Sequence, residues 1–314
     1  MEKILYSDLT QIRVDKYLSK LPAVESRNSL NIIFENNSVK VNRNSVKKSY
    51  ILSNGDIIEF ELPKIEPLIP VAREMELEIL FEDESICIVN KPAGLVVHPG
   101  AGNRDFTLLN GLIYHFGKQI KDVPRCGIVH RLDKETSGVI IISKDTKTHI
   151  ILSDMFKKRE IEKTYFSVVL GVTENQGVIN KPIKRDKRNY KKMVISDIGK
   201  EAITKFKAIK HFNFFTLLLI KPTTGRTHQI RVHLNSLNHP IFADKIYGKN
   251  SIDYVPLNFS SKIKYLLSNK IKRHVLHAER ICFSHPITKE ILEIVAPLPK
   301  DFKFLIDYFE KNGL

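Results

Sequence analysis

Residues 130–138 read His-Arg-Leu-Asp-Lys-Glu-Thr-Ser-Gly and hold the densest group of reactive side chains in the chain. The β-branched run Val139–Ile142 follows directly and predicts a buried strand. The polar group would then lie at the entrance to that strand, at the edge of a cleft. In extended backbone Arg131 and Asp133 point to the same side, and a nearby arginine favours an ionised carboxylate, which can act as a nucleophile or a base. The residues alone leave two interpretations open, a catalytic carboxylate and a surface ion pair.

A second polar cluster spans residues 224–231, which read Thr-Gly-Arg-Thr-His-Gln-Ile-Arg, and His233 follows it. A glycine next to a helix start can bind a phosphate through backbone amides, with Arg226 as a further donor. The cluster is not a Walker loop, because the lysine and the first glycine are missing, and it is not a dinucleotide fingerprint. A zinc site at His228 and His233 is a minor alternative, since the glutamate of a zinc protease motif is absent.

Local patterns predict alternating strands and helices from Met75 onward. We expect strands at 86–89, 139–142, 163–170, 203–209 and 215–220, and helices at 108–116, after Asp145, around 230–237 and at 302–309. Several of these strands follow one another without an intervening helix. This order favours an α+β fold with a mixed, largely antiparallel sheet over a doubly wound one.

The best domain boundary is the segment punctuated by Pro63, Pro67 and Pro70. It predicts a small α/β module at 1–64, a linker at 65–76 and a larger domain at 77–314. Within the module we expect helices at 13–20 and after Ser26, a strand at 39–41, and a turn at 54–55 followed by a strand at 57–60.

The charge balance restricts the class of partner. The net charge is +15 and the isoelectric point is about 9.5, which indicates a polyanionic partner. A lysine-rich surface kept for solubility is the plainer alternative, and an anionic membrane surface is a weaker one. No apolar run approaches the roughly 20 residues of a membrane span, and the first residues lack the apolar stretch of a signal peptide.

The three cysteines, Cys87, Cys126 and Cys282, are far apart in the sequence, so no CxxC pair exists. Their apolar neighbours predict reduced core thiols in a cytoplasmic protein.

Residues 130–138 resemble the signature of the large pseudouridine synthase family, which modifies ribosomal and transfer RNA. Further similar stretches occur in the family's order at 90–98, 163–165, 224–234, 276–278 and 283–286. The resemblance extends from about Leu77 to the C-terminus. It implies the pseudouridine synthase fold, with no metal or other cofactor. The chain departs from the family at Asn238 and Ala243, where glycine is common; both are expected to be fold positions.

The resemblance also implies roles for single residues. Asp133 matches the essential aspartate, Arg131 the residue that helps displace the uridine, Tyr165 the tyrosine that packs on the flipped base, and Arg231 the arginine that pairs with the aspartate. Isomerisation requires the base to leave its stack, and an aromatic face offers about 1–3 kcal/mol of stacking. By pattern alone, Tyr165 would be a core aromatic residue and Arg231 would form a surface salt bridge.

The N-terminal module resembles an S4-type RNA-binding domain, although Asn36-Asn37 stands where that family often has glycine. This resemblance predicts RNA contacts through Arg13, Ser26, Arg27 and Asn42.

A basic segment around residue 188 predicts further contacts with the RNA backbone, and a solvated loop is the alternative. The candidate residues, together with one from the second polar cluster, are Lys184, Arg185, Arg188 and Arg226.

Together these features predict a two-domain RNA pseudouridine synthase, most similar to the D type that acts on large-subunit ribosomal RNA. A synthase acting on transfer RNA and a non-catalytic RNA-binding protein are the alternatives. We expect a cytoplasmic monomer that binds RNA and no membrane.

Overall fold

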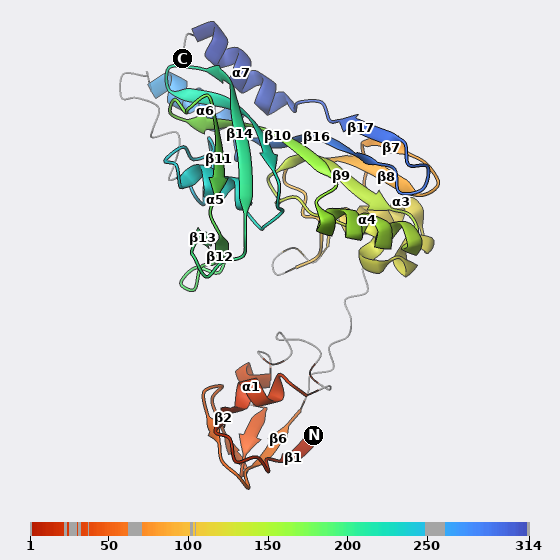
Figure 1. The fold of residues 1–314 in the computed structure, drawn as a ribbon, viewed down its shortest axis with the longest axis vertical. Helices are drawn as coiled ribbons and strands as arrows, with labels where there is room; N and C mark the ends of the chain where they lie inside the picture. The colour runs from red at the N-terminus through yellow and green to blue at the C-terminus, as the bar shows by residue number, and fades with distance from the viewer. Residues whose placement is uncertain are drawn as a thin grey trace. The chain divides into compact units, whose positions relative to one another are not determined.

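The computed structural model describes residues 2–21, 24, 30, 33–36, 38–61, 71–100, 103, 105–248 and 261–312. The chain forms two compact units, Met1–Ile69 and Pro70–Leu314 (Figure 1). Residues 71–76, assigned to a linker from the sequence, contain no helix or strand. They pack on the larger unit, because the side-chain amide of Asn110 donates to the carbonyl of Val71 and the N–H of Arg73 donates to the carbonyl of Asn110.

The smaller unit contains a four-stranded antiparallel sheet, a separate pair of strands and a short helix. The sheet order is β1 (Glu2–Leu5), β6 (Ile57–Phe60), β3 (Val39–Val41) and β4 (Asn44–Ser45), the pair is β2 (Ile12–Arg13) and β5 (Ile51–Leu52), and the helix is α1 (Val14–Leu18). The strands predicted at 39–41 and 57–60 are present. Leu18, Ile58 and Phe60 are among the residues buried in its core. Ser26, the predicted start of a second helix, lies outside the described residues.

The larger unit is built on a sheet of nine described strands. Its order is β11 (Gln176–Asn180), β14 (Ile203–His211), β15 (Phe215–Pro222), β10 (Glu162–Leu170), β16 (Leu276–Ser284), β9 (Ser137–Ser143), β8 (Ile86–Lys91) and β7 (Ile79–Glu82), with β17 (Ile291–Val295) also pairing with β16. Among the described strands of this sheet, only β9 and β16 pair in parallel. The predicted α+β class with a mixed, largely antiparallel sheet is therefore confirmed.

Five α-helices and one small hairpin are described around this sheet. They are α3 (Leu108–Phe116), α4 (Thr146–Lys158), α5 (Gln229–Asn235), α6 (Ser261–Lys270) and α7 (Lys300–Asn312), with the hairpin formed by β12 (Ile183–Arg185) and β13 (Met193–Ile195). The predicted cap of α4 is present, since the carboxylate of Asp145 accepts from the N–H of Thr148 at 2.8 Å. None of the helices in the described part of the chain is both long and apolar enough to cross a membrane.

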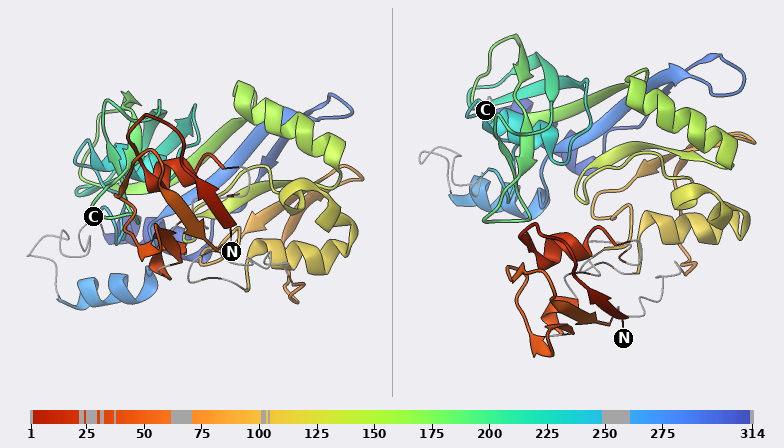
Figure 2. Two further views of the ribbon diagram at one scale, coloured as in Figure 1. Left: turned by 90° about the horizontal axis from the view of Figure 1, so that it is seen from below. Right: turned by 60° about the horizontal axis from the view of Figure 1, so that its bottom comes forward.

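The apolar run of β9 is explained by burial on both faces. Ile140 and Ile142 pack in one cluster with α3, whereas Val139 and Ile141 pack in another with Leu152 of α4. In both views of Figure 2 these two helices lie on opposite sides of the strands. A strand covered on both faces has apolar residues throughout rather than in alternation.

The other half of the sheet is also covered on both faces. Val168 of β10 belongs to the cluster that contains Phe302 and Phe309 of α7. The next residue, Val169, belongs to the cluster that contains Ile230 and Leu234 of α5. The packing of Ile230 and Leu234 on the sheet fixes the face of α5 that turns away from solvent.

The cysteines differ in burial. Cys87 and Cys126 are buried free thiols, and burial raises the pKa of Cys87 to about 12. Cys282 is only partly buried, because it lies on β16 where the strand's outer face is not fully covered. The prediction that all three are core thiols is therefore wrong for Cys282.

Gly138 permits the parallel contact between the two halves of the sheet. It pairs with Ala278 and has φ +114°, and a Cβ atom there would lie 2.1 Å from the carbonyl oxygen of Ala278. We expect Gly138→Ala to lower the free energy of unfolding by about 4 kcal/mol or more, through overlap and backbone strain. Urea unfolding measures this loss. Gly225→Ala is the matched control, because no atom lies within 4 Å of its Cβ position; equal stability of the two variants would contradict the prediction.

Candidate active site

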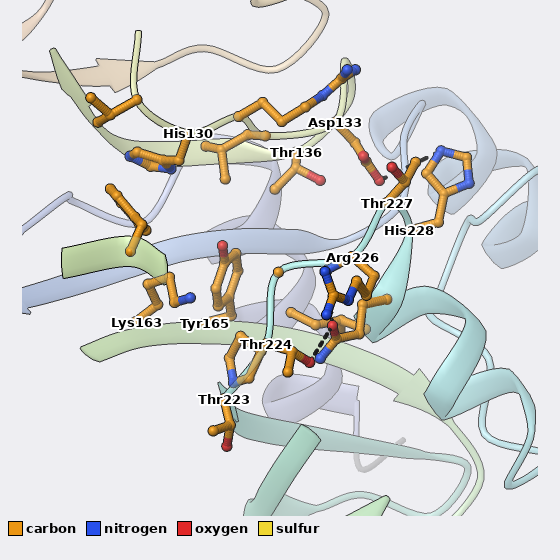
Figure 3. A pocket seen from close by; sticks show the side chains of 18 of the residues that line it. His130, Asp133, Thr136, Lys163, Tyr165, Thr223, Thr224, Arg226, Thr227 and His228 are labelled. Carbon is orange, nitrogen blue, oxygen red and sulfur yellow. Dashed lines mark hydrogen bonds and ion pairs between the residues drawn. The ribbon is translucent and has the colours of Figure 1, made fainter. Parts of the chain in front are cut away.

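A pocket of about 610 Å³ opens where β9 and β16 begin their parallel pairing. Its walls come from the loop before β9, from α4, from β10 and from the segment leading into α5. The polar side chains that line it include Arg125, His130, Arg131, Asp133, Thr136, Lys163, Tyr165, Arg226, His228 and Arg231. Figure 3 shows Lys163 and Tyr165 on one side of the pocket, and Asp133 facing His228 at another.

Arg231 holds Asp133 from one side and is itself held from the other. Its Nη1 donates to Oδ2 of Asp133 at 2.9 Å, while its Nε and Nη2 donate to the two carboxylate oxygens of Asp244 at 2.7 and 2.9 Å. The side chains of Arg231 and Asp244 are 5% and 0% exposed, and that of Asp133 is 19% exposed. Asp244 therefore fixes the guanidinium plane by a bidentate contact, and the third donor is aimed at the one carboxylate that faces the pocket.

His228 approaches the same carboxylate oxygen of Asp133 that Arg231 contacts. Its Nε2 lies 3.8 Å from Oδ2 of Asp133, and its Nδ1 lies 2.9 Å from the hydroxyl of Tyr247. Burial lowers the pKa of His228 below its ordinary value, partly offset by the charge of Asp133. The ring is therefore neutral near pH 7 and can either donate or accept a proton at Nε2.

Tyr165 is one of the aromatic residues that line the pocket. It stands on β10 between Ile220 of β15 and Ala278 of β16, next to a β-bulge after Thr164. Burial, together with the negative charge of Asp133, raises the pKa of its hydroxyl, so the phenol is neutral. Two positions earlier Lys163 lines the same pocket, and burial lowers the pKa of its ammonium group.

Buried cations fasten the loop that carries Asp133. Nζ of Lys91 donates to the carbonyls of Pro92, Leu95 and Lys134 at 2.7, 2.9 and 3.2 Å. Nη1 of Arg273 donates to the carbonyl of Glu135 at 3.1 Å. These contacts hold the carbonyls of Lys134 and Glu135, the two residues that directly follow Asp133, and so fix the loop on that side.

Comparison of the chain with known proteins identifies its family. Residues 85–236 match the family model described as RNA pseudouridylate synthase. Ribosomal large subunit pseudouridine synthase D of Buchnera aphidicola (subsp. Acyrthosiphon pisum) is 38% identical over 295 residues, which are 94% of this chain and 93% of that protein. The chain belongs to the RNA pseudouridine synthase family. It is thus an isomerase that converts uridine to pseudouridine in RNA.

Two further relatives agree. The Haemophilus influenzae protein named ribosomal large subunit pseudouridine synthase D is 37% identical, with 96% of this synthase and 92% of that protein covered. The solved structure of human RNA pseudouridylate synthase domain containing 4 has a TM-score of 0.57 at 26% identity and covers 74% of this synthase and 92% of that chain.

Asp133 and the three supporting residues predicted from the sequence all line the pocket of the synthase. The three are Arg131, Tyr165 and Arg231. Arg226 also lines it, although its Nε donates to the carbonyl of Glu201 at 2.9 Å. The backbone N–H of Arg226 donates to the side-chain oxygen of Gln229, so this amide is not available to the phosphate that the sequence suggested here.

The other predicted contacts lie elsewhere. Lys184, Arg185 and Arg188 belong to the β12–β13 hairpin and its loop, outside the pocket lining. Arg13 pairs with Asp15 at 2.8 Å. The side chain of Asn42 bonds to Asp56 and to the N–H of Ile57, within a turn of the smaller unit. Ser26 and Arg27 lie outside the described residues.

The suggested zinc pair is not assembled. His228 faces Asp133, whereas His233 bonds to Thr204 and to the carbonyl of Lys181. Across the described ranges no group of three or more His, Cys, Asp or Glu side chains is arranged to hold a metal ion. His130 is also structural, because its Nε2 accepts from the N–H of Ile141 and burial lowers its pKa to about 3.

Sequence reasoning missed four residues that organise the site: Lys91, Asp244, Tyr247 and Arg273. One weak signal was present. Asn238 and Ala243 replace glycines common in the family, and both adopt positive φ, 61° and 60°. Ala243 thus lies at a sharp bend immediately before Asp244, which indicates that the backbone there is held in a special conformation.

Proposed function

We propose that this synthase isomerises specific uridines in large-subunit ribosomal RNA, with Asp133 as the catalytic carboxylate. The observation that carries the proposal is the contact of Asp133 with Arg231 at 2.9 Å, inside a pocket walled by Tyr165. Relatives at 37–38% identity bear the name ribosomal large subunit pseudouridine synthase D, which supports the choice of RNA. A cytoplasmic site of action as a monomer is part of the proposal.

The reaction replaces one glycosidic bond with another. The N1–C1′ bond of uridine breaks, uracil turns, and a C5–C1′ bond forms; C5 then loses its proton and N1 gains one. No electrons are exchanged. The base must leave its helix first, and we assign Arg131 to its displacement and Tyr165 to stacking on the extruded base, worth about 1–3 kcal/mol.

Charge recruits the RNA. The net charge of +15 provides the sequence-independent attraction that phosphates require. Arg226 at the pocket, and Lys184, Arg185 and Arg188 on the hairpin, are the proposed contacts with the RNA backbone. Each phosphate contact strengthens binding and its dependence on salt.

We propose that residues 1–64 form an S4-like RNA-binding domain. Removing them should leave a folded catalytic unit that binds ribosomal RNA more weakly. The slope of log affinity against log salt should also become shallower, by about 0.9 for each duplex phosphate that the protein no longer neutralises. Binding titrations at several salt concentrations measure both. Unchanged affinity and slope would show that this unit does not contact the RNA.

Purified protein offered transcripts of large-subunit ribosomal RNA and of transfer RNAs tests the choice of substrate. We expect pseudouridine at a few defined positions of the ribosomal transcript and none above background in the transfer RNAs. The reverse pattern would establish the transfer RNA alternative. Absence of pseudouridine from every RNA would contradict catalysis itself.

A further inference from the structure

Tyr247 contacts three parts of the larger unit at once, and the reaction described above makes no use of it. Its hydroxyl accepts a hydrogen bond from the backbone N–H of Met193 at 2.8 Å and lies 2.9 Å from Nδ1 of His228. Its ring centre lies 5.1 Å from Cζ of Arg231, within cation–π range. The side chain of Tyr247 thus links β13 to His228 and Arg231, the two residues that approach Asp133.

The β12–β13 hairpin also packs on the helix that carries Arg231. Val232 of α5 forms a small apolar cluster with Ile183 of β12, and Met193 and Tyr247 pack against it. A two-stranded hairpin is marginally stable by itself. Backbone pairing of Ile183 with Lys200 holds the start of the hairpin, and this cluster and the hydrogen bond from Met193 to Tyr247 hold β13 against α5.

The loop of the same hairpin carries exposed positive charge. Arg185, Lys187, Arg188 and Lys191 are exposed within seven residues, and Tyr190 among them is 73% exposed. An RNA backbone is the polyanion that such a loop attracts. Arg185 lies close enough to His228 for its charge to add to the effect of burial in lowering the His228 pKa.

We infer that Tyr247 is a positioning residue that couples RNA contact at the β12–β13 hairpin to the orientation of His228 and Arg231 around Asp133. When RNA holds the hairpin, the N–H of Met193 holds the Tyr247 hydroxyl, and the hydroxyl holds the imidazole. Without bound RNA the hairpin is less restrained, and these hydrogen bonds orient the imidazole of His228 less firmly. The inference rests on the proposed function, because it assigns the hairpin to the same RNA.

A double-mutant cycle tests the coupling. Tyr247→Phe keeps the ring beside Arg231 and removes both hydrogen bonds. We expect its single-turnover rate constant at saturating ribosomal RNA to fall roughly tenfold, with the dissociation constant changed less than about twofold. Combined Arg188→Gln and Lys191→Gln should weaken binding roughly tenfold and also lower the saturated rate constant roughly threefold. Tyr114→Phe, which removes an exposed hydroxyl on α3, is the matched control and should behave as wild type.

The variant that combines all three substitutions tests whether the hairpin acts on the site through Tyr247. We expect its rate constant to equal that of Tyr247→Phe, because the hairpin has lost its connection to the site, while its binding is weakened as in the hairpin variant. If the effects on the rate constant multiply, or if Tyr247→Phe turns over as wild type, the inference is wrong while the proposed function stands. A wild-type protein that forms no pseudouridine would overturn the proposed function and this inference together.

The hydrogen bond between Met193 and Tyr247 can also be removed by a substitution at Met193. Met193→Ala keeps the backbone N–H and loses the side chain, whereas Met193→Pro also loses the N–H that Tyr247 accepts. Proline is tolerated in a strand where the N–H is not part of the ladder. We expect the proline variant to lose roughly tenfold more in the saturated rate constant than the alanine variant. Equal rate constants in two folded variants would contradict the coupling.

Discussion

Asp133→Asn should reduce pseudouridine formation by roughly a thousandfold or more and leave RNA binding within about twofold of wild type. The substitution keeps the size of the side chain and one acceptor for Nη1 of Arg231, but it removes the negative charge. A neutral amide is neither a nucleophile nor a base in this chemistry. Tritium released from C5 of labelled uridines measures the reaction, and filter binding measures affinity.

Asp154→Asn is the matched control for this variant. Asp154 lies on α4 in an exposed ion pair with Lys158, so the change removes the same charge outside the pocket. It should leave both the rate and the affinity as in wild type. Near-normal turnover by Asp133→Asn would refute the assignment of the carboxylate.

Arg231→Met should lose most activity and also much stability. Removing the guanidinium leaves Asp244 buried with no countercharge, which costs about 3–5 kcal/mol in the free energy of unfolding. Arg231→Lys keeps the charge but cannot reach Asp133 and both oxygens of Asp244 at once. We therefore expect the lysine variant to stay folded and still lose most of its turnover, measured as single-turnover pseudouridine formation.

A second substitution separates stability from orientation. Asp244→Asn in the Arg231→Met background removes the buried charge, and its side-chain oxygen can still accept from the N–H groups of Ile246 and Tyr247. Most of the lost stability should return, while activity should stay absent because nothing orients Asp133. Recovery of activity together with stability would show that Arg231 has only a structural role.

Local pattern was enough to predict most of the elements. The β-branched run at 139–142 is buried on both faces, and Asp145 caps α4 as its position before the helix predicted. Such signals depend on near neighbours in the chain. The contact of Arg231 with Asp133 was predicted only through the family resemblance, since the pattern alone favoured a surface salt bridge and the structure buries the arginine.

The supports of the site could not be predicted, because they depend on contacts distant in sequence. Lys91 lies at the end of an apolar strand, where a lysine is normally exposed, yet its ammonium group binds a carbonyl 43 positions later. Asp244 is a single carboxylate without periodic context, and its role appears only when α5 brings Arg231 beside it. Tyr247 likewise meets Met193 across 54 positions.

The most direct measurement is a map of pseudouridine in total RNA from cells that lack this protein, complemented with wild type or with Asp133→Asn. The account predicts that a few positions in large-subunit ribosomal RNA lose pseudouridine in the deletion, regain it with wild type and do not regain it with the variant. Unchanged large-subunit RNA in the deletion, or full restoration by Asp133→Asn, would contradict it.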